Sequence, residues 1–248
     1  MNEDVPVDDP WAVLRASTQA RIGLGRAGSS LPTRRVLEFA AAHAAARDAV
    51  HEPLDVESFG AAVAEVGIGT PVHVRSRAES RAEYLRRPDL GREPADLAGL
   101  APDGSDVAVV LADGLSPRAL AEHGAGMLRA LVDALGEQYR IAPPVIATQA
   151  RVALGDAVGE ALGVTTLVVV IGERPGLSVA DSLGIYLTHA PRPGRSDADR
   201  NCISNIHPPG GQSYANAARI TAALVAGSRE LGVSGVRLKD TAGPELLA

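Results

Sequence analysis

Short apolar runs alternate with amphipathic segments through the second half of the chain. The runs predict four strands, with the sequences VAVVLADGLS, PPVIATQ, TTLVVVIGE and SLGIYLTHAP. The third contains the run VVVI with no alternation of polar and apolar residues, which is typical of a strand covered on both faces. The GERPG stretch that follows it is therefore where a buried strand leaves the sheet.

Two helices are predicted between the first three strands. Residues 117–135 begin after Ser116, a favourable helix cap, with Pro117 as the first helical residue, and residues 150–163 end at Gly163. The order strand, helix, strand, helix, strand with short loops is typical of a right-handed parallel sheet. A long helix over residues 213–232 follows the last predicted strand. We therefore predict an α/β fold built on a parallel sheet.

The first half of the chain has a different character, because it is rich in helix formers and arginine. Helices are predicted from Pro32 to about Val50 and over residues 57–67. A short segment, PVHVRSRA, and an arginine-rich piece follow them. The character changes at the LAGLAPDGSD loop, so we place a domain boundary near residue 100. Residues 1–100 then form a smaller, mainly helical region, and residues 101–248 form the sheet domain.

The composition indicates a soluble globular protein of the cytoplasm. The chain has 248 residues, a hydrophobic content of 46% and a net charge of −6, so a large core is possible and a nucleic-acid partner is not expected. Cys202 is the only cysteine, which excludes an internal disulfide and a multi-cysteine zinc site. There is no apolar stretch of the roughly 18 to 20 residues that a membrane helix needs, and no signal peptide.

Polar residues and glycines gather where the predicted strands end. In an open α/β sheet, ligands bind in the crevice beyond the carboxyl ends of the strands. Loops as long as residues 190–206 are usually functional or disordered, and the apolar Ile203 and Ile206 indicate that this one packs on the domain. Four segments should therefore meet at one edge of the sheet: the turn at Asp113 and Gly114, the helix entry at Arg151 and Val152, the turn at Glu173, and the loop over residues 190–206.

The turn at Glu173 has two interpretations. Pro175 and Gly176 turn the chain sharply, which leaves the Glu173 carboxylate at the lip of the crevice, where it can accept hydrogen bonds from a ligand amide or hydroxyl. An ordinary solvated turn has the same composition. The chain lacks the loops that usually bind dinucleotides and triphosphates, since no G-x-G-x-x-G follows the first strand and no G-x-x-x-x-G-K-[ST] occurs.

Several stretches of the chain resemble the small subunit of ethanolamine ammonia-lyase. They are ARIGLGRAGSSLPTRRVLEFAAAHAAARDAVHEPLD, RVALGDAVGEALG, LVVVIGERPGLS, DSLGIYLTHAPRPGR, DRNCISNIHPPGG and YANAA, and they cover most of residues 11–240. The resemblance implies an adenosylcobalamin-dependent lyase that converts ethanolamine to acetaldehyde and ammonia. It also implies a hetero-oligomer, in which a large TIM-barrel subunit holds the substrate and this chain binds the cobalamin with a Rossmann-like domain.

By the same resemblance, the cobalamin contacts fall on Val152, Glu173 and Cys202. Cobalamin carries amides on its corrin rim, and its nucleotide tail carries hydroxyls and one phosphodiester. Binding it therefore requires hydrogen-bond partners at several separate positions. Glu173 can accept, and Val152, near a helix N-terminus, can offer backbone groups. The Cys202 side chain is alternatively a small buried hydrophobe whose backbone makes the contact. No D-x-H-x-x-G motif is present, which agrees with the family, so we expect no cobalt ligand from this chain. The resemblance assigns the substrate chemistry to the large subunit, so we assign no catalytic residue to this chain.

Other interpretations of the same residues stay open. A stand-alone Rossmann-like enzyme that uses a nucleotide, or a small-molecule hydrolase, would use Asp113 and Glu173 as its carboxylates. His43, Arg47 and His51 form one polar stripe along the predicted N-terminal helix, which is either a solvated face or a surface that docks on the large subunit. Packaging in a bacterial microcompartment is an alternative to free cytoplasm.

Overall fold

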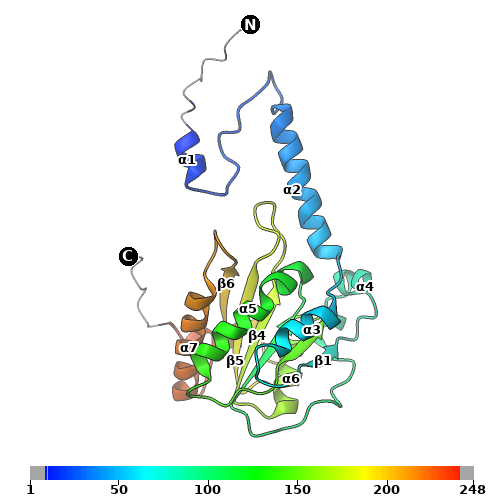
Figure 1. Cartoon of the computed structure of the whole chain (residues 1–248), viewed down its shortest axis with the longest axis vertical. Coiled ribbons are helices and arrows are strands. Elements are labelled where there is room, and N and C mark those ends of the chain that lie inside the picture. The colour runs from blue at the N-terminus through cyan, green and yellow to red at the C-terminus, as the bar shows by residue number, and fades with distance from the viewer. Residues whose placement is uncertain (1–8, 10, 241–248) are drawn as a thin grey trace.

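The computed structural model describes residue 9 and residues 11–240. Within them the α/β prediction is confirmed, because a six-stranded sheet is surrounded by helices (Figure 1). The strands are β1 (Val72–Arg75), β2 (Val107–Ala112), β3 (Val145–Thr148), β4 (Thr166–Gly172), β5 (Leu183–His189) and β6 (Arg200–Ile206). The helices are α1 (Ala12–Ala16), α2 (Thr33–His51), α3 (Val56–Ala64), α4 (Arg81–Arg86), α5 (Pro117–Leu135), α6 (Leu154–Leu162) and α7 (Tyr214–Leu231), with short 3-10 turns at Leu90–Arg92, Asp197–Asp199 and Gly235–Arg237.

The sheet is mixed, so the prediction of a parallel sheet is wrong for β5, and β6, which was not predicted as a strand, is antiparallel as well. The strand order is β1-β3-β2-β4-β5-β6. The first four strands are mutually parallel, whereas β5 pairs antiparallel with β4, and β6 antiparallel with β5. A parallel crossover needs a dozen or more residues, usually a helix, whereas β4 and β5 are joined by a short loop that can only form a hairpin.

Two further strands lie where none was predicted. β6 occupies the second part of residues 190–206, a segment predicted as a loop, because only one of its faces is buried and its polar residues hide the strand pattern. β1 lies within residues 1–100 and pairs with β3. The N-terminal region, predicted as mainly helical, therefore contributes an edge strand to the sheet.

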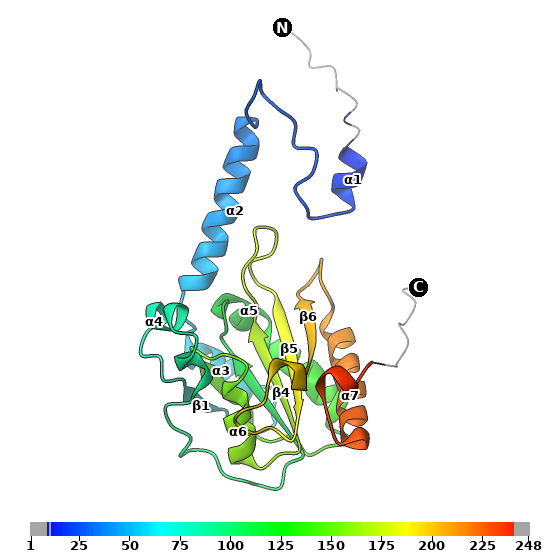
Figure 2. The ribbon, with the colours of Figure 1, turned by 180° about the vertical axis from the view of Figure 1, so that it is seen from behind.

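Helices cover both faces of the sheet, and each face has its own apolar core. One core packs α3, α5 and α7 against the sheet, and the other packs α6 against the opposite face of β2, β3 and β4. Figure 2, seen from behind, shows α6 on this second face. The helix caps agree with the sequence, since Ser116 caps α5 ahead of Pro117 and Gly163 ends α6 in a left-handed conformation. The central strands are thereby fully buried.

The N-terminal arm, residues 11–51, stands away from the sheet and then returns to one of its edges (Figure 1). α2 has one fully buried residue, Ala49, and exposes apolar side chains, including those of Leu37 and Phe39. The segment before α2 reaches the loop between β4 and β5, where Arg21 donates a 2.8 Å hydrogen bond to the Leu177 carbonyl. The arm is therefore anchored at both ends, with an exposed helix between them.

Candidate functional site

A cavity of about 300 Å³ opens at the carboxyl ends of the parallel strands, where the sequence predicted a crevice. Two glycines of its lining, Gly114 in the turn after β2 and Gly172 at the end of β4, lie close together. A Cβ at Gly114, which has φ +56°, would lie 2.2 Å from the Gly172 carbonyl oxygen, so this close approach requires glycine. The cavity is lined by Tyr84, Gly114, Leu115, Arg151, Val152, Ile171, Gly172, Glu173, Arg174 and Tyr186.

One carboxylate oxygen of Glu173 accepts hydrogen bonds from the protein, and the other accepts none from the described residues. Its Oε2 accepts a 2.7 Å hydrogen bond from the Ser182 hydroxyl and a 3.2 Å bond from the Asn205 backbone N–H. Gly184 leaves room for the side chain, since a Cβ there would lie 3.1 Å from Oε1. No hydrogen bond from the described residues reaches Oε1. Glu173 is therefore oriented by the protein, with an acceptor free for a ligand.

A bulge in β6 supplies the backbone donor that holds Glu173. The register slips between Leu183 and Ile185 of β5, so that β6 carries an extra residue there. Asn205 lies in this bulge with φ +60°, a conformation that asparagine tolerates better than most residues. Its side-chain oxygen is 3.1 Å from Nε2 of His207. Because of the bulge, the Asn205 N–H donates to the Glu173 carboxylate and not to a carbonyl of β5.

Val152 follows β3 immediately before α6 and lines the same cavity as Glu173. Its carbonyl accepts a hydrogen bond from the Gly155 N–H, whereas no acceptor among the described residues takes its own N–H. The backbone N–H groups before the first turn of a helix are available to a ligand and favour negative or carbonyl oxygens. The structure therefore brings two of the three predicted contacts, Val152 and Glu173, to one cavity.

Cys202 is not in the lining of this cavity but is adjacent to a residue that is. It sits opposite Tyr186 in the pairing of β5 with β6, and Tyr186 lines the cavity. Cys202 is exposed in this chain and is not part of either apolar core, and which part of the residue contacts a ligand stays a prediction. Burial by neighbouring atoms raises the pKa of the Cys202 thiol, the Tyr186 hydroxyl hydrogen-bonded to it lowers that pKa, and the Glu173 charge raises it. Burial also raises the pKa of Tyr186 to about 12, so both groups are protonated at neutral pH.

This environment predicts how Cys202 reacts. Alkylation needs the thiolate, so the labelling rate of Cys202 should rise at a higher pH than that of a free cysteine, whose pKa is about 8.5. Tyr186→Phe removes the hydrogen bond that lowers the thiol pKa and should move the profile to still higher pH. Iodoacetamide labelling followed by mass spectrometry measures both profiles. Half-maximal labelling below pH 8 would contradict this description of the thiol.

Asp113 has a structural role. Its carboxylate is 3% exposed and accepts hydrogen bonds from the backbone N–H groups of Gln149 (2.8 Å) and Ala150 (3.0 Å). Arg81 lies 3.5 Å from it. Burial raises the pKa of Asp113, and Arg81 and the two amides oppose that rise. A carboxylate occupied in this way ties β2 to the β3–α6 loop and is not placed to attack a substrate.

Tyr84 is a lining residue that the sequence analysis missed. Its ring is fully buried and has two guanidinium groups over it, with Arg81 at 4.8 Å and Arg151 at 4.5 Å from the ring centre. Its hydroxyl donates a 3.1 Å hydrogen bond to the Ala150 carbonyl. Tyr84 belongs to α4, far from the strand ends in sequence, and only the arginine-rich composition of that segment could have indicated the stack.

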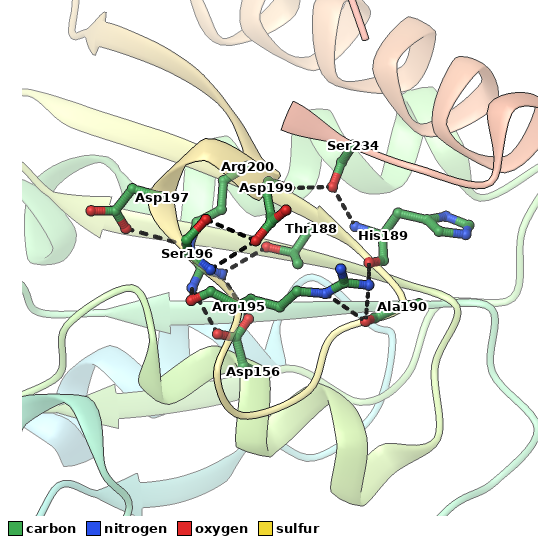
Figure 3. Close-up of polar contacts among 10 residues, drawn as sticks. All are labelled: Asp156, Thr188, His189, Ala190, Arg195, Ser196, Asp197, Asp199, Arg200 and Ser234. Atoms are coloured by element: carbon green, nitrogen blue, oxygen red, sulfur yellow. Dashed lines mark hydrogen bonds and ion pairs between the residues drawn. The ribbon is translucent and has the colours of Figure 1, made fainter. Parts of the chain in front are cut away.

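A buried ion pair fixes the loop beside the site (Figure 3). Arg200 of β6 makes two 2.7 Å hydrogen bonds to the carboxylate of Asp156 in α6, and each side chain is 1% exposed. The same guanidinium donates to Thr188 (3.0 Å) and to the Arg195 carbonyl (3.0 Å). These bonds join β6, β5 and α6 and hold residues 190–199 next to Val152.

The described residues contain no group of three or more histidine, cysteine or acidic side chains that could hold a metal ion. In the same part of the chain, no helix is long and apolar enough to cross a membrane. The fold and its edge cavity define a class of protein: an open α/β domain with a cavity beyond the carboxyl ends of its parallel strands, which is where ligands bind in sheets of this kind.

Comparison with known proteins gives the particular family. Residues 8–239 match the family model described as "Ethanolamine ammonia-lyase light chain (EutC)". The chain is 65% identical over 249 residues to the ethanolamine ammonia-lyase small subunit of Rhodococcus erythropolis, covering 100% of this chain and 97% of that one. It is 49% identical to the small subunit of Xanthomonas campestris pv. campestris, with 98% and 92% covered, and 46% identical to that of Ralstonia nicotianae, with 99% and 94% covered.

The chain therefore belongs to the ethanolamine ammonia-lyase small subunit family, and the predicted resemblance is confirmed. It is a subunit of a lyase.

Proposed function

We propose that this chain binds adenosylcobalamin and holds it against the large subunit of an ethanolamine ammonia-lyase, which converts ethanolamine to acetaldehyde and ammonia. The observation that carries the proposal is the cavity that Val152 and Glu173 share, with a free acceptor at Glu173 Oε1. Family membership supports the same assignment. The parallel strands and covering helices agree with a Rossmann-like domain.

The residues of this chain fit the groups that a cobalamin presents. Glu173 Oε1 accepts from a corrin side-chain amide or a ribose hydroxyl, and the Val152 N–H donates to an amide carbonyl or a phosphate oxygen. Cys202 lies beside them on β6, within reach of the Tyr186 hydroxyl. When bound, the cofactor supplies the radical chemistry of the reaction. This chain orients it and excludes water, and the groups that contact ethanolamine belong to the large subunit.

We propose a hetero-oligomer in which residues 1–100 dock on the large subunit. The exposed apolar side chains of α2, such as those of Leu37 and Phe39, support this, because large apolar side chains in one exposed region are typical of an interaction surface. His43, Arg47 and His51 are exposed on the same helix and would form a polar part of that surface. The complex is proposed for the cytoplasm, with a microcompartment as the alternative.

The activity of the separated subunits tests the proposal. The chain is purified alone and mixed with the large subunit, and acetaldehyde release is measured with adenosylcobalamin and ethanolamine. We expect activity only in the mixture. Activity of the isolated chain would favour a stand-alone enzyme, which would need Asp113 as a working carboxylate although its oxygens are already occupied.

Glu173→Ala should raise the Kd of the complex for adenosylcobalamin by about tenfold, since a hydrogen bond to a charged group contributes about 1.5 to 3 kcal/mol. Glu173→Gln keeps the size of the side chain, removes its charge and replaces one acceptor oxygen with an NH2 donor. Glu160→Ala changes an exposed glutamate at the far end of α6 and is the matched control. An unchanged cobalamin titration of the Glu173 variants would remove Glu173 from the contact set.

A further inference from the structure

A second cavity of about 430 Å³ adjoins the Glu173 cavity and is lined by three arginines. Arg92 comes from the segment after α4, Arg151 from the entry to α6, and Arg195 from the loop before β6. Val152, Tyr186 and Arg151 line both cavities. One ligand can therefore occupy the two cavities together.

In the described part of the chain, the three arginines of this arginine cavity form no salt bridge. The charge of Arg195 still acts on two carboxylates: it opposes the rise that burial causes in the pKa of Asp156, and it adds to the hydrogen bonds that lower the pKa of Asp199. Among the described residues, neither Arg92 nor Arg151 has a side-chain hydrogen bond or ion pair, and Arg151 Nε is buried without a partner. Arg195 donates only to the carbonyls of His189 and Ala190, as Figure 3 shows. The one acidic residue in the lining, Asp197, lies 3.6 Å from Arg200 Nε.

The chemistry of the lining selects an anion with several acceptor oxygens. Guanidinium groups bind phosphate oxygens with charge-assisted hydrogen bonds, and three of them on three different segments around one cavity can serve several oxygens of one group. The N–H groups of the first three residues of α6 already donate to the carbonyls of residues 151–153, but the Val152 N–H, in the lining of the same cavity, has no acceptor among the described residues and is a further donor for an anion. In the part of the chain that the structure describes, none of the three arginines has a carboxylate partner within salt-bridge distance, although the whole chain has a net charge of −6.

We propose that the arginine cavity binds the phosphodiester of the cofactor's nucleotide tail while Glu173 binds an amide or hydroxyl of the same molecule. This inference rests on the proposed function, because it assumes that cobalamin occupies the Glu173 cavity. The phosphodiester is the only anionic group of the cofactor, and the arginine cavity is the complementary positive site. Free phosphate has the same chemistry and is the other source of such a group.

The test compares two ligands on the complex with the large subunit. Adenosylcobalamin carries the phosphodiester, whereas adenosylcobinamide has the corrin and its amides but lacks the nucleotide and the phosphodiester. Arg92→Gln and Arg195→Gln should each raise the Kd for adenosylcobalamin by about tenfold, the value of one hydrogen bond to a charged group, and leave that for adenosylcobinamide unchanged. Arg192→Gln, in the same loop as Arg195 but outside the lining, is the matched control.

Each outcome separates this inference from the proposed function. Equal weakening of both ligands, or no change in either, by the two arginine variants would overturn the phosphodiester site. Glu173→Ala should weaken adenosylcobalamin in either case, and adenosylcobinamide as well when the group bound to Glu173 is a corrin amide; if it weakens neither, the placement of the cofactor itself fails. Inorganic phosphate is titrated as well. If Arg92→Gln lowers phosphate affinity but leaves adenosylcobalamin affinity intact, the cavity is a free-phosphate site and the assignment to the cofactor is wrong.

Discussion

Replacing Arg200 with methionine should lower the free energy of unfolding by about 3 to 5 kcal/mol, because it leaves a buried carboxylate without its partner. Asp156 is 1% exposed, and both of its oxygens are bonded to Arg200 at 2.7 Å (Figure 3). The substitution also removes the donors to Thr188 and to the Arg195 carbonyl. Chemical denaturation of the isolated chain measures the change.

Two controls separate the charge from the packing. Arg77→Met breaks the exposed pair with Glu93, in which the side chains are 58% and 59% exposed, and should cost at most about 1 kcal/mol. The double variant Arg200→Met with Asp156→Leu removes both charges and should recover much of the lost stability. A loss below about 1 kcal/mol for Arg200→Met alone would show that Asp156 finds other partners or water.

Tyr84→Ala should destabilise the chain by about 3 to 5 kcal/mol, the range for removing a large buried aromatic side chain. The ring is fully buried, and both Arg81 and Arg151 stack on it. Its loss also frees Arg151, so adenosylcobalamin binding by the complex should weaken as well. Denaturation of the chain and cobalamin titration of the complex measure the two effects.

Tyr84→Phe is the matched control for this variant. It keeps the ring and loses only the hydroxyl bond to the Ala150 carbonyl, so a cost of about 1 kcal/mol is expected. Cobalamin affinity should then stay close to that of the unaltered complex. Equal destabilisation by the two variants would contradict the stacking argument and assign the role of Tyr84 to its hydroxyl.

The buried strands and capped helices were predictable because their signals are local. The apolar runs of β2 and β4 are long enough to identify a covered strand, and Ser116 and Gly163 mark helix ends by their own conformational preferences. The direction of β5 could have been predicted as well, since the loop after Glu173 is too short for a parallel crossover.

The rest of the site depends on contacts between distant segments. β6 is an edge strand with one buried face, so its polar residues resemble a loop. Tyr84 and Arg92 come from a helical segment before the predicted boundary at residue 100, and no local pattern links them to Val152. The orientation of Glu173 requires a bulge at Asn205, which only the pairing of β5 with β6 reveals. The division at residue 100 stays a prediction.

A structure of the complex with the large subunit and adenosylcobalamin tests the central claim most directly. The account predicts one tetrapyrrole in contact, at about 4 Å or less, with Val152, Glu173 and Cys202, at the edge where the parallel strands end. Its amide or ribose groups should bond Glu173 Oε1. A cofactor bound to another face of this chain, with Glu173 and Val152 still open to solvent, would contradict it.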